Sequence, residues 1–317
     1  MANKRPIGPR IDEPTGTETV GHEWDGIEEL NTPLPRWWLL TFYATILFSI
    51  AYVVVYPAIP LGNRGTEGLW GWTSRGQLAA ETSKADAQRA GLYAALAKTP
   101  IEALPADPQL LRAAIEGGRA AFKVNCVQCH GAGAAGIVGK YPNLNDNDWL
   151  WGGDLKAIET TITHGIRQPG DDMTRTSLMP SFGRDGILTP AQVGDVASYL
   201  RTLGKQEGPT PAATRGEAIY AANCVVCHGA AGEGGRNVGA PKLNDAIWLY
   251  GGKKADIVNS VTNAHAGVMP AWNTRLDSVT IKMLAAYVHS LGGGEDAPAP
   301  AAGPADAAGA AAAPAAK

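Results

Sequence analysis

The sequence predicts a mostly α-helical protein in which one membrane-spanning helix precedes two similar domains. Three observations predict this fold class. An uncharged, apolar run covers residues 37–59. The pattern Cys-x-x-Cys-His occurs twice, at residues 126–130 and 224–228, and it uses all 4 cysteines of the chain. The residues that flank the pattern also repeat, which indicates two copies of one structural unit.

Length and charge limit the classes of function. A chain of 317 residues has room for about two domains and their connections. The net charge of -3 and the pI near 6.1 give no basic surface of the kind that binds nucleic acid, so we exclude nucleic acid as a partner. The 39 glycines and 22 prolines indicate many loops, which small domains built around a cofactor tolerate.

The chain begins with a polar segment and a membrane anchor. Residues 1–36 are rich in Pro, Gly and acidic residues, and we expect an extended tail without its own core. Residues 37–59 are long enough to cross the hydrocarbon core, and Trp37, Trp38 and Tyr56 lie near the ends, as interfacial aromatic residues do. A cleaved signal peptide would have a shorter apolar region closer to the terminus, so the run predicts a retained single-pass transmembrane helix.

Residues 60–104 are expected to form a connector between the anchor and the first repeated domain. An Ala-rich helix is predicted from Ser74 to about Ala97, with Ser74 as its N-cap and Gln77 three residues on.

The repeated pentapeptide has the spacing of a c-type haem attachment site. Two thiols on one short turn can each form a thioether to a haem vinyl group, and the next residue then presents its imidazole to the iron. A dithiol redox site needs no histidine there, and a zinc site needs four converging ligands. The sequence therefore predicts two covalently bound haem c groups, attached through Cys126, Cys129, Cys224 and Cys227, with His130 and His228 as proximal iron ligands.

The flanking repeats predict two tandem domains of the class I cytochrome c type. Domain 1 is expected at residues 105–204, a linker at 205–213 and domain 2 at 214–292. Each copy has a helix before the haem motif, a Gly-rich loop, a middle helix, a Met-Pro loop and a closing helix. Residues 293–317 are Ala- and Pro-rich, and we expect them to be disordered.

Met179 and Met269 are the candidate distal ligands, because each begins the Met-Pro loop of its copy. Thioether ligation raises the potential of haem iron. Three histidines are competitors for this position: His164, His265 and His289. None of them stands in the Met-Pro loop. With both axial positions filled, the haems would pass electrons and would not bind oxygen, and no set of catalytic residues is discernible.

Two arguments orient the chain. Positive charges before the span, Lys4, Arg5, Arg10 and Arg36, outnumber the nearby ones after it, Arg64 and Arg75. Haem c is also attached outside the bacterial cytoplasm. We therefore expect a protein of the bacterial inner membrane with a cytoplasmic N-terminus, a periplasmic connector and periplasmic haem domains.

These features resemble one family. The chain is similar to the dihaem subunit (CcoP or FixP) of bacterial cbb3-type cytochrome c oxidases. The resemblance lies in the run from Gly21 to Asn31, in Pro35, Arg36, Trp37 and Trp38 ahead of the two tandem haem domains, and in the run from Thr73 to Arg75. The resemblance covers roughly residues 20–291. It implies an electron-transfer subunit that has no catalytic site of its own.

The resemblance also implies partners and a ligand arrangement. Electrons would come from a periplasmic cytochrome c and pass towards a mono-haem subunit and a catalytic subunit that holds haem b, haem b3 and copper and reduces oxygen to water. In this family the two methionines are exchanged, so that each domain's methionine completes the other domain's haem. Simple spacing instead pairs Met179 with the first haem and Met269 with the second. The sequence does not choose between these pairings.

Two other functions fit some of these features. A dihaem subunit of a membrane dehydrogenase, or an independent anchored carrier, would have the same haem motifs, but the residues before the membrane span argue against both. A haem-based sensor would need a vacant or labile sixth ligand position. The sequence leaves open the two reduction potentials, the haem that receives electrons from the donor, and the contacts of residues 22–30.

Overall fold

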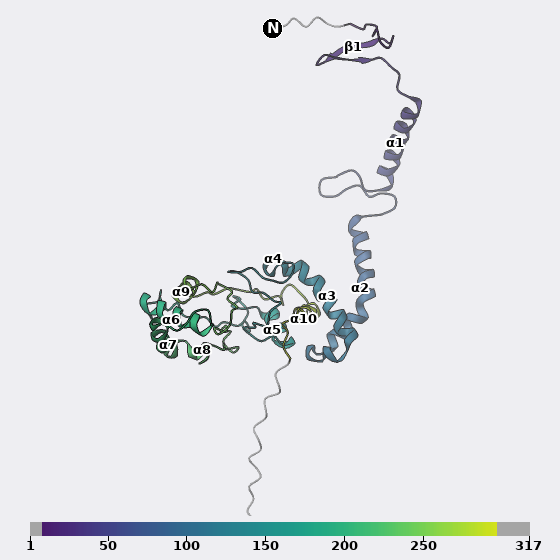
Figure 1. Cartoon of the computed structure of the whole chain (residues 1–317). Helices are drawn as coiled ribbons and strands as arrows, with labels where there is room; N and C mark the ends of the chain where they lie inside the picture. Colours follow the sequence, from purple (N-terminus) through teal and green to yellow (C-terminus); the bar gives the residue numbers. More distant parts are fainter. Residues whose placement is uncertain (1–7, 297–317) are drawn as a thin grey trace, which may run out of the picture. The chain divides into compact units, whose positions relative to one another are not determined.

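The structure is a computed structural model that describes residues 8–296, and residues 1–7 and 297–317 lie outside the description (Figure 1). The chain divides after Gln88 into two compact units, with the division inside helix α2 (Ser74–Lys98).

The N-terminal segment contains a β-hairpin. Strand β1 (Thr19–Trp24) pairs antiparallel with β2 (Ile27–Leu30). Asp25 and Gly26 connect them with positive φ angles of 50° and 90°, and Asp-Gly is a favoured pair for a two-residue hairpin turn. Arg10, whose carbonyl accepts the N–H of Thr19, forms an ion pair with Glu28 of β2 at 2.9 Å. Residues 19–30 therefore form a paired hairpin within the segment expected to be an extended tail, because Asp25 and Gly26 close a two-residue turn.

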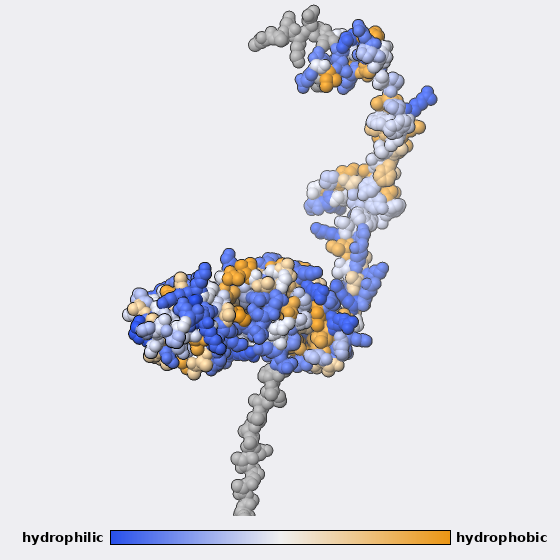
Figure 2. Space-filling view, viewed as in Figure 1, coloured by the Kyte–Doolittle hydropathy of each residue, from blue (hydrophilic) through white to orange (hydrophobic). Residues whose placement is uncertain are grey.

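Helix α1 (Arg36–Val55) confirms the predicted transmembrane helix. It is the one helix in residues 8–296 that is long and apolar enough to cross a membrane, and none of its residues is buried by the rest of the chain. Figure 2 shows the hydrophobic residues along its surface. The helix ends four residues before the predicted boundary at Ile59, because Tyr56 is extended and Pro57 follows it.

The segment after α1 folds back on the helix end. The backbone N–H of Leu69 donates to the carbonyl of Val54 at 3.1 Å, and the Tyr56 ring packs edge-on against Trp70 and Trp72. Helix α2 then begins at the predicted residue, but its cap differs from the expectation. Thr73 Oγ1 accepts the N–H of Gly76 at 2.9 Å, so the cap is Thr73 and Ser74 is the first helical residue.

The second unit is built from helices and loops, which confirms the mostly α fold class. Its elements in chain order, after the end of α2, are η1 (Ile101–Ala106), α3 (Pro108–Asn125), α4 (Val127–His130), α5 (Leu155–His164), α6 (Pro190–Leu203), α7 (Pro211–Asn223), α8 (Val225–His228), α9 (Lys254–Asn263) and α10 (Ser278–His289).

Helix packing in this unit crosses between the two sequence repeats. The last helix of the chain, α10, packs on α3 and α5 of the first repeat, and α6 packs on α7 and α9 of the second (Figure 1). Equivalent aromatic pairs join the crossed helices, Phe122 with Tyr287 at 5.3 Å and Tyr199 with Tyr220 at 5.2 Å between ring centroids. Each repeat thus gives its closing helix to the other.

Two hydrophobic cores result from this exchange. The first core contains buried residues of α3, α5 and α10, and the second core contains buried residues of α6, α7 and α9. Leu96, Ile101 and Leu104 also belong to the first core, so the end of the expected connector is part of a packed body. Neither core is built from one repeat alone. The predicted domain bounds, residues 105–204 and 214–292, therefore describe the repeat in the sequence and stay a prediction as domain bounds.

The first residues of the expected disordered tail are bound to the second unit. The indole N–H of Trp149 donates to Gly293 O at 2.5 Å, and the N–H of Gly153 donates to a carboxylate oxygen of Glu295 at 2.8 Å. The expectation of disorder is therefore wrong for residues 293–296. The rest of that expectation, residues 297–317, lies outside the described residues.

Candidate functional site

Each Cys-x-x-Cys-His motif forms a one-turn helix directly after a longer helix. Helix α3 ends at Asn125, Cys126 follows as its cap, and α4 carries Cys129 and His130. The N–H of His130 donates to Cys126 O at 2.9 Å, which closes the turn and places the thiols and the imidazole on one short segment. Helices α7 and α8 repeat this arrangement around Cys224 with the same 2.9 Å bond from His228.

A proline carbonyl fixes each histidine ring. His130 Nδ1 lies 3.2 Å from Pro142 O, and His228 Nδ1 lies 3.0 Å from Pro241 O. Burial lowers the pKa of both rings, and the proline carbonyl opposes this effect. A neutral ring that donates from Nδ1 keeps its Nε2 lone pair for a metal, and the carbonyl makes that nitrogen more basic. Both histidines are thus oriented as ligands.

The four cysteines are free thiols. Burial, followed by the charge of the neighbouring cysteine, raises the pKa of Cys126 and of Cys224 to about 11. Cys126 and Cys224 therefore stay protonated at neutral pH. No group of three or more His, Cys, Asp or Glu in residues 8–296 is placed to hold a metal ion. Two thiols beside an oriented imidazole fit a covalently attached haem.

Each methionine loop packs against the core that contains the haem motif of the other repeat. Met269 packs against the first core, together with Cys126, and its N–H and carbonyl each pair with Ile166 at 3.0 Å. Gly165, with φ 66°, lies so close to Met269 O that a Cβ atom there would collide with it. Met179 instead packs against the second core, together with Cys224. The structure thus brings together the pairs that the exchanged arrangement requires.

The Met179 loop is held by α9 of the second repeat. The Ser181 hydroxyl donates to Asn263 O at 2.9 Å, and the N–H of Arg184 donates to Thr262 O at 2.9 Å. In the same way, the N–H of Trp272 donates to Ile162 O at 3.1 Å at the end of α5. Each loop therefore rests on the middle helix of the other repeat.

The three competing histidines have other contacts. His164 Nδ1 lies 3.1 Å from both carboxylate oxygens of Asp171. His265 stacks on the Tyr250 ring at 3.7 Å and lies 3.0 Å from the Ser260 hydroxyl through Nε2. His289 Nε2 lies 2.9 Å from Glu295 O. The bonded nitrogens of these rings are occupied within the protein.

Sequence reasoning missed two residues between the methionine loops, Arg167 and Asp171. Both lie in residues 165–178, a segment that is longer than its counterpart in the second repeat. The extra length does not indicate what the segment contacts. The contacts of Arg167 and Asp171 reach the Met269 loop of the other repeat, and no sequence pattern indicates them.

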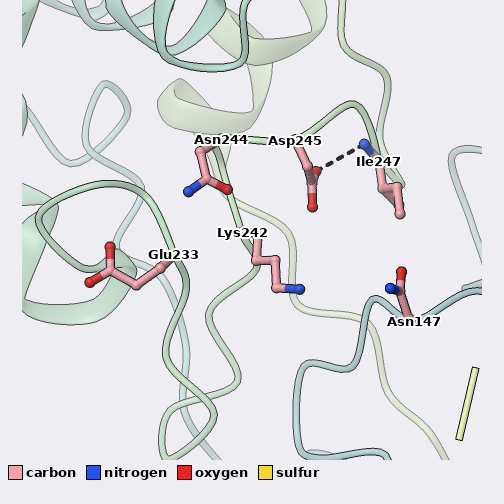
Figure 3. A pocket seen from close by; sticks show the side chains of 6 residues that line it. All are labelled: Asn147, Glu233, Lys242, Asn244, Asp245 and Ile247. Atoms are coloured by element: carbon pink, nitrogen blue, oxygen red, sulfur yellow. Dashed lines mark hydrogen bonds between the residues drawn. The ribbon is translucent and has the colours of Figure 1, made fainter. Parts of the chain in front are cut away.

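A polar cavity of about 380 Å³ is lined by residues of both repeats (Figure 3). Asn147 comes from the first repeat, and the other five lining residues come from the second: Glu233, Lys242, Asn244, Asp245 and Ile247. Nearby, burial and the charges of Asp245 and Asp146 raise the pKa of Asp148 to about 6, with Lys242 acting in the opposite direction. Figure 3 shows the side chains of Lys242 and Asp245 on the side of the cavity nearer Asn147.

Three protein-family models match the chain. The N-terminal domain of cytochrome oxidase-cbb3, FixP, matches residues 16–63, cytochrome c matches residues 115–204, and the cbb3-type cytochrome c oxidase subunit III matches residues 211–288. The two cytochrome c matches imply haem c.

Curated relatives match over nearly the whole chain. The cbb3-type cytochrome c oxidase subunit CcoP of Cereibacter sphaeroides is 49% identical over 289 residues, which cover 91% of this chain and 99% of the relative. Subunit FixP of Azorhizobium caulinodans is 52% identical over 286 residues, 90% of this chain and 96% of the relative. Subunit CcoP of Azospirillum brasilense is 48% identical over 288 residues, 89% of this chain and 97% of the relative.

Proposed function

Because the chain belongs to the CcoP/FixP family of cbb3-type cytochrome c oxidase subunits, we propose that it is the membrane-anchored electron-transfer subunit of such an oxidase and carries two covalently bound haem c groups. The observation that carries the proposal is the repeated thiol turn, in which His130 and His228 are each anchored to a proline carbonyl at 3.2 and 3.0 Å.

The ligand sets follow from the packing of the two cores. Cys126, Cys129 and His130 would hold the first haem, and Cys224, Cys227 and His228 the second. We assign Met269 as the distal ligand of the first haem and Met179 as that of the second. The contacts of Met269 with the first core and of Met179 with the second support this exchanged assignment.

A haem held by one histidine and one methionine would supply a reversible one-electron couple, and its iron would have no vacant position for oxygen. The protein's part is to hold the ligands and exclude water. The proline carbonyls orient the imidazoles, and the crossed helices fix the distance between the two methionine loops. Soft thioether ligation favours the reduced iron and raises the potential. The subunit would therefore relay electrons, and the reduction of oxygen would occur in another subunit.

The anchor sets the place of the subunit in the membrane. We propose that the N-terminal hairpin is cytoplasmic and that both haem-binding cores are periplasmic, since haem c is attached on that side and Arg10 and Arg36 precede the span. Electrons would come from a periplasmic cytochrome c and pass to a mono-haem subunit and the catalytic haem–copper subunit.

Purification of the tagged chain in detergent tests the complex. The proposal expects a haem–copper catalytic subunit and a mono-haem cytochrome c to be recovered with it, and two haems per chain in the alkaline pyridine spectrum. Recovery of a membrane dehydrogenase instead would support the alternative function. Cys224→Ser together with Cys227→Ser should halve the covalent haem content.

Single-haem chains test the exchanged ligands. In the Cys224→Ser, Cys227→Ser chain, the near-infrared band of the oxidised Met–iron bond should disappear with Met269→Ala and persist with Met179→Ala. The opposite result would show that each methionine serves its own repeat.

A further inference from the structure

Arg167 lies between the two chain segments that lead to the methionines. Its neighbour Ile166 pairs antiparallel with Met269, and the N–H of Arg167 donates to Arg175 O at 2.8 Å. Arg167 itself has a φ of 53°, a left-handed conformation that is uncommon for residues other than glycine. The backbone thus places the Arg167 side chain where it can reach both segments.

The guanidinium group of Arg167 joins the two segments. Nε donates to Gly267 O at 2.7 Å, and Nη1 donates to Ser177 O at 2.9 Å. Gly267 lies two residues before Met269, and Ser177 lies two residues before Met179. The Arg167 side chain therefore donates to a backbone carbonyl two residues before the methionine in both loops.

Other features suit Arg167 to this position. It has no carboxylate partner within 4.0 Å in the described part of the chain, and burial lowers its pKa. The planar guanidinium has donors in a fixed fork, so its two bonds hold the two carbonyls in one geometry. Hydrogen bonds from a charged donor are stronger than neutral ones.

We propose that Arg167 is a positioning residue that couples the two methionine loops, so that the release of one methionine from its iron loosens the other. The inference rests on the proposed function, because it requires that both methionines are iron ligands. Since each loop belongs to the opposite repeat, this coupling would make the two ligation states interdependent. Such coupling is reciprocal by thermodynamic linkage.

Imidazole displacement measures loop release directly. Imidazole binds ferric haem only after the methionine has left the iron, so its affinity reports how readily each loop opens. In the oxidised full-length chain in detergent, we expect two-site binding with positive cooperativity. Arg167→Gln should tighten imidazole binding at both haems by about fivefold or more, the lower end of typical coupling effects, and should abolish the cooperativity.

Separate measurements at each haem use histidine as a replacement ligand. Met179→His or Met269→His is expected to hold one iron as a bis-histidine haem, so that imidazole titrates only the other iron. Arg167→Gln should tighten binding in both backgrounds. Arg175→Gln is the matched control, because Arg175 is in the same segment and half-buried but contacts Thr161 and the Trp151 ring, not a methionine loop. It should change the affinity by less than twofold.

Three outcomes would overturn the proposal: tighter binding at one haem alone, an equal effect of Arg175→Gln, or unchanged cooperativity in Arg167→Gln. If Arg167→Gln fails to incorporate haem, Arg167→Lys keeps the charge but loses the fork, and it should show the same direction at both haems with a smaller change. The near-infrared Met–iron band of the unmodified chain tests the ligands separately. Its absence would refute the proposed methionine ligation, whereas the three outcomes above would refute the coupling in a chain that shows the band.

Discussion

The backbone of Gly118 in α3 lies directly against the carbonyl oxygen of Met283 in α10, and a Cβ atom at Gly118 would collide with that carbonyl. Gly216 in α7 has the same relation to Asp195 O in α6. Both contacts join helices of different repeats. The close crossing of the exchanged helices therefore depends on the absence of a side chain at these two positions.

Gly118→Ala should separate α3 from α10. Overfilling a packed contact costs about 1–3 kcal/mol, and here the opposing atom is a backbone carbonyl that has little freedom to move. We expect a loss of thermal stability of the haem-loaded chain, measured by circular dichroism, and a lower haem content at the first site. Gly117→Ala is the control, because its Cβ atom would meet the flexible end of the Met283 side chain. An equal effect of both variants would contradict this explanation.

Lys282 in α10 is a buried cation at the end of α2. Its ammonium group donates to Leu96 O and to Thr99 O, each at 2.6 Å. These carbonyls lie where the helix dipole is negative. Lys282→Met keeps the length of the side chain but leaves both carbonyls without this donor, so we expect a loss of about 2–4 kcal/mol in the free energy of unfolding.

Denaturant unfolding of the full-length chain measures the effect of Lys282→Met. Lys123→Met is a suitable control, because Lys123 is exposed on α3 and exposed substitutions change stability by less than about 0.5 kcal/mol. A cost for Lys282→Met as small as that of the control would show that the buried ammonium group does not hold α2 to the first core.

Asp148 should make stability depend on pH. Its pKa is raised from 3.8 to about 6 by burial, Asp245 and Asp146, so the folded state binds this proton more tightly than the unfolded state does. The contribution of the protonated Asp148 to the free energy of unfolding is complete below pH 3.8, and it is lost as the pH rises through about 6. Asp148 is partly exposed, so solvent screens part of the roughly 3 kcal/mol that this pKa shift represents, and at neutral pH the ionised group then destabilises the fold by about 1–2 kcal/mol.

Asp148→Asn should therefore raise the melting temperature at pH 7. The advantage should shrink as the pH falls and disappear near pH 4, where the aspartate of the unmodified chain is protonated as well. Thermal melts from pH 4 to 7 measure this difference. An advantage that stays constant over this range would show that Asp148 is not a buried titrating group.

The sequence was sufficient for the elements that local rules determine. The apolar run predicted α1, and the spacing of Cys126, Cys129 and His130 predicted a turn that presents two thiols and an imidazole together. The Asp25-Gly26 turn follows equally local rules. Each of these features depends on neighbours a few residues away.

The exchange of α6 and α10 could not be derived from the sequence itself. The two repeats have similar closing helices, so the hydrophobic pattern of α10 fits α7 as well as α3. The choice depends on contacts between residues far apart in sequence, such as Phe122 with Tyr287. The position of Met269 follows from that choice, and only the family resemblance indicated it.

Asp171 connects the Met269 loop to α5 by side-chain contacts. Its carboxylate lies 3.1 Å from His164 Nδ1 and accepts from the Asn273 side chain at 3.0 Å and from the N–H of Met173 at 2.8 Å. Burial acts to raise the pKa of Asp171, but the hydrogen bonds from Met173, His164 and Asn273 outweigh it and lower the pKa. The carboxylate's stabilising effect is therefore present at neutral pH and lost as the pH falls through its lowered pKa.

Asp171→Asn replaces one carboxylate oxygen by an NH₂ group, which cannot accept all three bonds. We expect the Met269 loop to loosen more than the Met179 loop, which Ser181 also holds to Asn263 O and which the substitution reaches only through Arg167. The half of the near-infrared Met–iron band that belongs to the first haem should then become more sensitive to added imidazole than the other half. Asp172→Asn is the control, because Asp172 is the exposed neighbour in the same segment. Equal sensitivity of both haems in Asp171→Asn would mean that Asp171 supports the fold as a whole and not one methionine loop.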